Sequence, residues 1–182
     1  MQAARSLCRI PRRIESEGDS CMNNDDREEL FELIEDVGTA MLVTEKDNDL
    51  RSRPMSGKLY RDSCEIWFLT ERLSGKVQEI TEDQNSNLTY ACPEKETYIS
   101  ITGTAALSRD ADKIDDLWGP WAEAWLQCEK DDPKVAAIRF KPELAEYWSS
   151  PSSSLVQAWE LAKANLTGHQ PEMGENKTVS MS

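Results

Sequence analysis

The stretch TAMLVTEKDNDLRSRPMSGKLY (39–60) contains two runs of strand-forming residues separated by the turn residues KDND (46–49). Asp and Asn tolerate the left-handed backbone of tight turns, so the stretch predicts a β-hairpin. Alternation along its second strand places Arg51, Arg53 and Met55 on one face. A strand that combines two arginines with a proline is either a charged edge strand in solvent or part of a binding site.

The rest of the chain predicts more short strands with helices between them. Helices are expected at 25–38, 74–83 and 110–126, the last one kinked or split at Pro120. Strands are expected at 65–70, 87–92, 97–108, 135–140 and 143–149. Short turns favour antiparallel pairing, and we expect the strand that carries Arg53 to pair with EIWFLT (65–70). The pattern predicts a mainly β fold, a small antiparallel barrel with helical decoration.

The two ends of the chain differ from its centre in composition. The first fourteen residues contain four arginines and no acid, so residues 1–23 are interpreted as a disordered extension or as lying upstream of a true start at Met22. Residues 24–150 are predicted to form the folded domain. Residues 151–182 are expected to hold one short helix, at 155–166, and a polar, disordered end.

Composition and charge exclude several classes of function. Thirty-four acidic against 21 basic residues give a net charge of −13, which argues against binding to nucleic acid. The apolar runs are too short to span a membrane. Five scattered cysteines without a CxxC spacing predict free thiols in the cytoplasm. The single histidine, His169, lies in a polar segment, so no metal site, His-ligated haem or Ser–His catalysis is expected.

A second stretch, TERLSGK (70–76), predicts an anion site. It reads as a strand end, a loop and a helix start, with Ser74 at the N-cap, free backbone N–H groups behind it, and Lys76 in the first turn. If Arg53 lies on a neighbouring strand, its guanidinium and the Lys76 ammonium converge on those N–H groups. That combination suits a phosphate dianion. By itself, the stretch favours an ordinary helix start with an exposed lysine over an anion site.

Several motifs in a fixed order resemble one family. RPM (53–55), IWFLT (66–70), S-x-K (74–76) and YISITG (98–103) are followed by LWGPWAEAW (117–125), IRF (138–140) and AEYW (145–148). This order is similar to that of the pyridoxamine-phosphate-oxidase-like flavin-binding split barrels, and the later motifs resemble the general stress protein branch. The resemblance implies an FMN-binding split barrel and a homodimer with FMN at the subunit interface.

The resemblance also implies ten cofactor-binding residues. They are Arg53, Pro54, Met55, Ser56, Leu69, Thr70, Ser74, Gly75, Lys76 and Trp148. Arg53 and the helix start at 74–76 would hold the FMN phosphate, residues 54–56 would lie along the isoalloxazine, and residues 69–70 would border it. Trp148 would pack beside the ring from the other subunit. Lys58 matches a further basic position of the oxidase pattern.

The sequence departs from the true oxidases after the late tryptophan. Those enzymes hold the phosphate of their vitamin substrate with arginine and histidine there, whereas this chain has SSPSSSLVQA (149–158). Oxidation of pyridoxamine phosphate is therefore disfavoured, and no catalytic residue or substrate is assigned. A flavin-dependent oxidoreductase, a non-enzymatic flavin carrier or stress sensor, and a split barrel that uses F420 remain as alternatives. Trp118, Trp121 and Trp125 are expected to pack in the core or at the dimer interface.

Overall fold

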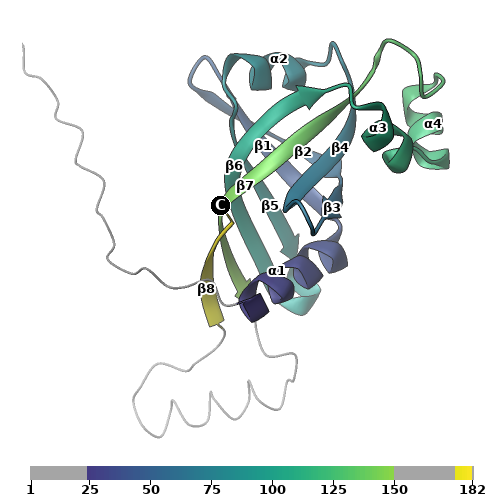
Figure 1. Cartoon of the computed structure of the whole chain (residues 1–182). Coiled ribbons are helices and arrows are strands. Elements are labelled where there is room, and N and C mark those ends of the chain that lie inside the picture. Colours follow the sequence, from purple (N-terminus) through teal and green to yellow (C-terminus); the bar gives the residue numbers. More distant parts are fainter. Residues whose placement is uncertain (1–23, 150–174, 182) are drawn as a thin grey trace, which may run out of the picture.

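The computed structural model describes residues 24–149 and 175–181, and every structural statement below concerns these residues. Its helices are α1 (Asn24–Val37), α2 (Gly75–Glu82), α3 (Ala111–Leu117) and α4 (Pro120–Leu126), with a short 3-10 helix at Pro93–Lys95. Its strands are β1 (Thr39–Lys46), β2 (Asp49–Ser56), β3 (Lys58–Tyr60), β4 (Glu65–Glu71), β5 (Asn85–Cys92), β6 (Thr97–Ser108), β7 (Val135–Ser149) and β8 (Glu175–Ser180). The fold is mainly β with helical decoration, as predicted (Figure 1).

The predicted hairpin forms at the start of the sheet. β1 and β2 pair antiparallel from Lys46 opposite Asp49 to Thr39 opposite Ser56. The two turn residues have positive φ angles, 55° at Asp47 and 65° at Asn48, which is the backbone of a two-residue hairpin turn. Asp and Asn adopt this conformation more readily than other non-glycine residues, so the local sequence sets the register.

The two edge strands of the sheet meet at Gly57. The strands follow the order β2-β1-β5-β6-β7-β4-β3, all antiparallel, so β2 and β3 lie at opposite edges although one residue separates them in the chain. Because consecutive Cα atoms are about 3.8 Å apart, the sheet has to curl until its edges come together. The result is a barrel-like sheet that β2 and β3 do not close by pairing with each other within the described chain.

This topology corrects one prediction. The strand that carries Arg53 does not pair with 65–70. β2 pairs with β1, and of the predicted strand only its last part, the short β3, pairs with β4. The physical reason lies at Gly57, where a Cβ atom would come within 2.4 Å of the ring of Phe68. The chain passes so close to this buried ring that the strand predicted at about 50–60 breaks into two.

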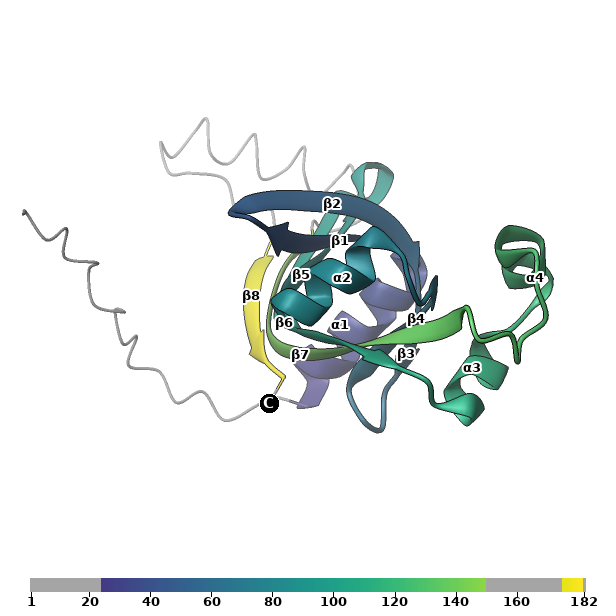
Figure 2. The ribbon, with the colours of Figure 1, turned by 90° about the horizontal axis from the view of Figure 1, so that it is seen from above.

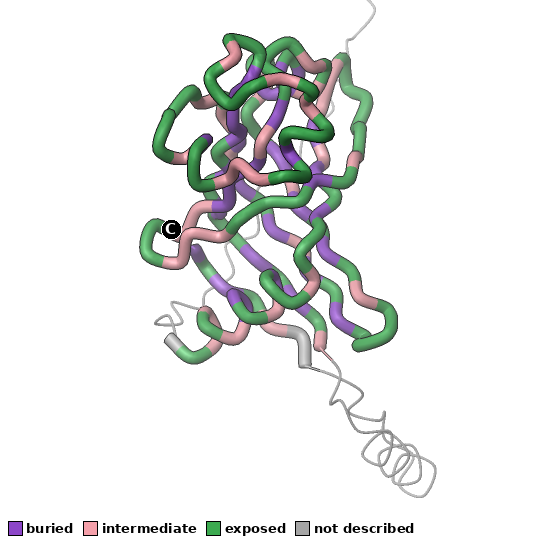
Figure 3. Tube along the Cα trace, turned by 90° about the vertical axis from the view of Figure 1, so that its right-hand side faces the viewer, coloured by how far each residue is buried: buried purple, intermediate pink, exposed green. Residues whose placement is uncertain are grey.

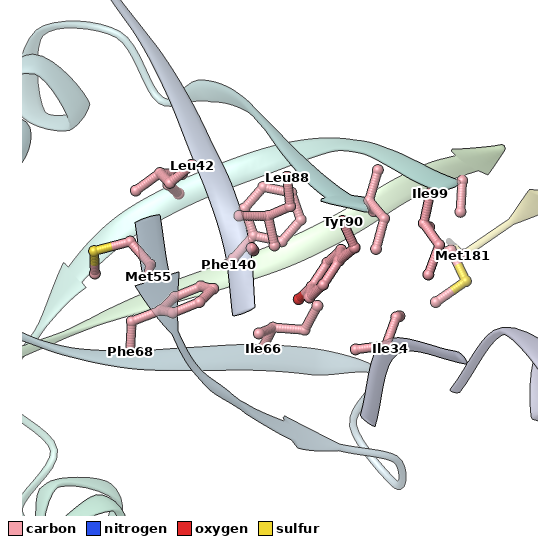
Figure 4. Close-up of a cluster of buried hydrophobic side chains, with 14 of the residues drawn as sticks. Ile34, Leu42, Met55, Ile66, Phe68, Leu88, Tyr90, Ile99, Phe140 and Met181 are labelled. Carbon is pink, nitrogen blue, oxygen red and sulfur yellow. The ribbon is translucent and has the colours of Figure 1, made fainter. Parts of the chain in front are cut away.

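One hydrophobic core fills the interior, and two helices cover its ends. The buried segments lie along the inner faces of the strands (Figure 3), and side chains from distant strands meet there, among them Leu42, Met55, Phe68, Tyr90 and Phe140 (Figure 4). α1 covers one end of the barrel and α2 the other (Figures 1 and 2).

α1 packs its apolar stripe onto the core and ends where the sequence predicts. Leu30, Phe31 and Ile34 are buried on the core side of this helix. Gly38 follows with a φ of 75°, and its amide donates to the Ile34 carbonyl at 2.9 Å. Glycine adopts this left-handed backbone at no steric cost, so the predicted helix stop is confirmed.

The end of the chain is more ordered than predicted. Residues expected in a polar, disordered tail form β8, which pairs with the second half of β7 from Ser180 opposite Leu144 to Glu175 opposite Ser149. Val179 and Met181 are buried in the core, and Lys177 pairs with Asp26 and Glu29 of α1. β4 pairs only with the first part of β7, so the second part would otherwise be an open edge. The helix expected at 155–166 lies outside the described residues.

A second, smaller apolar cluster holds α3 against the outside of β4 and β7. It contains Trp67, Ile114, Val135 and Ala137, with Trp118 packed beside them. The predicted break at Pro120 is confirmed, since α3 ends at Leu117 and α4 begins with the proline.

Trp121 and Trp125 do not pack in the core of this chain. Their exposed fractions are 69% and 71%, and their rings stack on each other with centroids 5.5 Å apart. A core position was therefore the wrong expectation for these two residues, while packing at a dimer interface stays a prediction. No helix in the described ranges is long and apolar enough to cross a membrane.

We predict that Gly57→Ala lowers the free energy of unfolding by about 1–3 kcal/mol, because the added methyl group meets the fully buried Phe68 ring. Gly75→Ala is the matched control, since nothing lies within 4 Å of a Cβ atom at that position. Its effect should stay within about 0.5 kcal/mol. Equilibrium unfolding in urea measures both, and equal stability of the two variants would contradict the close approach at Gly57.

Candidate functional site

The start of α2 presents unused hydrogen-bond donors. The Ser74 carbonyl accepts from the amides of Val77 and Gln78 at 3.0 and 3.3 Å. The amides of Gly75 and Lys76 precede these in the first turn and have no acceptor among the described residues. The Ser74 side chain does not cap the helix; its hydroxyl lies 3.3 Å from the Thr70 hydroxyl. The space beside Gly75 is open, so a ligand atom can approach the backbone here.

Lys76 adds a half-buried cation to this helix start. No carboxylate within the described ranges forms an ion pair with its Nζ atom. Burial lowers the pKa of Lys76, and the positive charge of Arg53 lowers it further, while Glu71 and Glu79 act in the opposite direction. Arg53 bonds to Glu79, about one turn beyond Lys76 on the same helix, so both cations lie at α2.

Arg53 reaches the same region from β2. It lies on the inner face of the barrel with Met55, but beyond the apolar part, where β1 contributes Thr44. Its Nη1 donates to the Thr44 hydroxyl at 2.7 Å, and its Nη2 donates to Glu79 Oε2 at 2.7 Å. β2 is an edge strand, as one interpretation expected, yet its arginines face α2 rather than solvent alone.

Glu79 is the acceptor that joins these groups. Its side chain is 3% exposed. Its Oε2 accepts a hydrogen bond from Thr44 Oγ1 at 2.6 Å, and its Oε1 accepts one from Arg51 Nη1 at 3.1 Å, in addition to the bond from Arg53. Burial alone would raise its pKa, but the hydrogen bonds from Thr44, Arg53 and Arg51 and the positive charge of Arg53 outweigh burial and hold the pKa below its ordinary value. Glu79 is therefore an ionised carboxylate inside the protein.

Glu79 and Thr44 were not predicted as site residues from the sequence, and no partner was predicted for Arg51. A signal for Glu79 was present: it stands between Val77 and Ile80, the two residues that place the buried face of the helix. A carboxylate on the buried side of an amphipathic helix requires a cationic partner, and the two arginines of β2 supply it.

The residues expected along the flavin ring do not share one surface. Pro54 and Ser56 are exposed on β2, whereas Met55 is buried in the core. On β4, Thr70 is buried near Ser74, and Leu69 points to the other side of the strand into the smaller cluster under α3.

Lys58 belongs to a different part of the molecule. It lies on β3, and its Nζ donates to both carboxylate oxygens of Asp116 at 2.8 Å. The Tyr60 hydroxyl donates to the same carboxylate at 2.5 Å, and the Lys113 Nζ lies 3.3 Å from the Tyr60 ring centroid. These contacts hold α3 against the edge of the sheet, where the Lys58 ammonium is paired with the Asp116 carboxylate.

Trp148 lies far along β7 from the helix start. Thr70, near Ser74, pairs with Ala136 at the beginning of β7, and Trp148 follows twelve residues later, roughly 40 Å of extended strand. Figure 1 shows α2 at the opposite end of the barrel from the end of β7. Trp148 is 39% exposed beside its register partner Tyr98, which is 43% exposed. Within one chain, Trp148 and Lys76 do not form a common site.

Comparison with known proteins agrees with this fold. A solved structure described as a general stress protein 26 from Jannaschia sp. CCS1 is 29% identical, covers 86% of this chain and 98% of its own, and superposes with a TM-score of 0.71. The general stress FMN/FAD binding protein from Xanthomonas citri is 23% identical, with a TM-score of 0.64 over 72% of this chain and 93% of its own.

A curated relative extends the comparison to a fungus. Protein bli-3 of Neurospora crassa is 24% identical over 124 residues, 64% of this chain, and the match spans 59% of that protein's length. The family described as pyridoxamine 5'-phosphate oxidase like matches residues 25–172, which is most of the sequence. The chain belongs to the pyridoxamine 5'-phosphate oxidase like family, and its structural neighbours include general stress proteins of the 26 type.

Proposed function

We propose that the protein binds FMN and holds the FMN phosphate at the start of α2. The observation that carries this proposal is the half-buried Lys76, which forms no ion pair among the described residues. It lies in the first turn of α2 with two amides that have no acceptor there, and the same helix binds Arg53 through Glu79. A phosphate accepts from N–H groups at a helix start and from cationic side chains at once. The relative from Xanthomonas citri that carries FMN/FAD in its name supports a flavin as the ligand.

The charges around this helix start suit a phosphate monoester. Arg51, Arg53 and Lys76 contribute three positive charges, and the ionised Glu79 removes one. These four groups together carry two net positive charges, which suits a phosphate dianion such as that of FMN, while Glu71, which also acts on Lys76, offsets part of this charge. Once bound, the flavin would supply the redox chemistry, while the side chains of this chain bind and orient it.

The proposed site needs a second copy of the chain. Trp148 is too far from Lys76 to reach the same flavin within one chain, so the tryptophan beside the ring would come from another subunit. The exposed pair Tyr98 and Trp148, with Leu144 also exposed on β7, supplies an aromatic and apolar outer surface for this contact. We therefore propose a homodimer with FMN between the subunits.

Two activities fit such a site. The first is a flavin-dependent oxidoreductase whose substrate is unknown. The second is a flavin carrier or stress sensor, which residues 149–158 favour because they lack the arginine and histidine that hold a substrate phosphate in the true oxidases. Steady oxidation of a nicotinamide donor by the FMN-loaded protein, with an added electron acceptor that reoxidises the flavin, would support the first and count against the second.

Native mass spectrometry of the purified protein tests the cofactor directly. We expect a dimer that carries two FMN molecules, and added FMN should raise the melting temperature of the unloaded protein. If the protein releases F420 or FAD instead, that molecule is its cofactor and the proposal of FMN is wrong. A protein that neither carries a flavin nor gains stability from FMN would overturn the proposal.

Lys76→Ala should weaken FMN binding by about 1.5–3 kcal/mol, the range for a hydrogen bond to a charged group. The quenching of flavin fluorescence measures this affinity at low salt. Lys95→Ala is the control, because Lys95 pairs with Asp36 of α1 at the other end of the barrel. If the two variants bind FMN equally well, Lys76 takes no part in the site.

The affinity for FMN should depend on pH in two directions. Below about pH 6 the phosphate dianion takes up one proton and becomes a monoanion, so binding weakens. At alkaline pH binding weakens again as Lys76 loses its proton, and because its pKa lies below the ordinary 10.5, this loss begins earlier than for a solvated lysine. Lys76→Arg stays charged and should keep its affinity at alkaline pH. The same alkaline loss in both proteins would assign it to another group.

A further inference from the structure

We infer that Glu79 is the positioning residue of the phosphate site: it holds Arg53 and Arg51 in the orientation in which their remaining N–H groups meet the ligand. The inference rests on the proposed FMN site and adds a residue that does not itself touch the phosphate. Its basis is the geometry of one buried carboxylate that receives two arginines and a threonine hydroxyl.

Glu79 is fixed in space before any ligand binds. It lies on the buried side of α2, one turn beyond Lys76, between Val77 and Ile80. Its side chain is 3% exposed, and a carboxylate in such a position is stable only when cations and hydrogen bonds compensate for the lost water. Because the helix backbone fixes the position of Glu79, the side chains of its partners orient toward Glu79.

The arginines, by contrast, are not fixed by their own strand. β2 is an edge strand, and the Arg51 side chain is 54% exposed, the Arg53 side chain 22%. A free arginine side chain keeps rotamer entropy, which is lost when a ligand orders it. A rigid acceptor that orders the guanidinium in advance removes this cost from the binding step.

Thr44 completes the arrangement around Arg53. The Thr44 hydroxyl accepts from Arg53 Nη1 at 2.7 Å and donates to Glu79 Oε2 at 2.6 Å, while Arg53 Nη2 donates to that same oxygen at 2.7 Å. The three groups form a closed ring of hydrogen bonds, which fixes the plane of the guanidinium. A single ion pair would leave that plane free to rotate.

The contact with Glu79 leaves Arg53 able to bind a phosphate. A guanidinium has five N–H donors, and the described contacts use one on Nη1 and one on Nη2. Three donors remain for a phosphate beside the start of α2. Glu79 therefore orients Arg53 without competing with the ligand for it.

The test compares FMN with riboflavin, which has the same ring but no phosphate. Dissociation constants of both flavins are measured by fluorescence quenching for the full-length protein and for Glu79→Gln, which keeps the shape of the side chain and removes its charge. We expect the dissociation constant for FMN to rise about tenfold or more and that for riboflavin to stay within about threefold. A purely structural role would weaken both flavins alike.

Two further variants make the comparison sharp. Thr44→Val opens the hydrogen-bond ring without changing any charge, so FMN binding should weaken by about threefold even if Glu79→Gln folds poorly. Glu35→Gln is the control, because Glu35 holds Arg61 through two hydrogen bonds, away from α2, and this variant should leave the affinity for both flavins unchanged.

The outcomes separate this inference from the proposed function. A wild-type protein that binds no FMN would overturn the proposed function and the inference with it. A wild-type protein that binds FMN, combined with unchanged or tighter FMN binding in Glu79→Gln and Thr44→Val, would overturn the role of Glu79 alone. Tighter binding in particular would mean that Glu79 competes with the phosphate for Arg53.

Discussion

The constraint on which the rest of the structure depends is the single residue between β2 and β3. Gly57 joins the two edges of the sheet, so the sheet has to curl, and the missing side chain lets the chain pass directly over the Phe68 ring. Curling gives the barrel an inside, which the core fills. It also places the inner face of β2 below α2, and this arrangement alone brings the arginines of β2 to the start of that helix.

At that end of the barrel, the apolar interior gives way to a small charged assembly. Met55 and Leu42 belong to the core, whereas Thr44 and Arg53 on the same strands bond to Glu79 of α2. The assembly does two things at once. It closes the barrel with a compensated ion pair. On the outer side it leaves Lys76, two amides of α2 and the remaining guanidinium donors, none of which has a partner within residues 24–149 and 175–181. Stability and the proposed phosphate site thus depend on the same residues.

Local features of the structure could be predicted from the sequence. The turn at Asp47 and Asn48, the helix stop at Gly38 and the break at Pro120 each follow from the backbone preference of one or two residues. We predicted that Arg53 lies near the helix that starts at Ser74, and Arg53 does bond to Glu79 of α2, but the prediction used a wrong pairing of strands. The sequence pattern shows which residues share a face of a strand, and it does not show which strands are neighbours.

What could not be predicted depends on contacts between distant segments. Strand β8 pairs with β7, and Val179 and Met181 pack in the core there. The short polar segment ENKTVS contains no signal that predicts pairing with β7. Glu79 stands between the buried Val77 and Ile80, but the sequence does not show that its partners are the two arginines of β2. The exposure of Trp121 and Trp125 likewise depends on where α4 stands, away from the barrel (Figure 2).

A crystal structure of the protein with FMN is the most direct test of the central claim that the start of α2 holds a flavin phosphate. The account predicts the phosphate within hydrogen-bond distance of the Gly75 and Lys76 amides, Lys76 Nζ and Arg53, with Glu79 still bonded to both arginines. It also predicts Trp148 of a second copy beside the flavin ring. A flavin bound elsewhere, or a phosphate that touches neither Lys76 nor Arg53, would contradict the account.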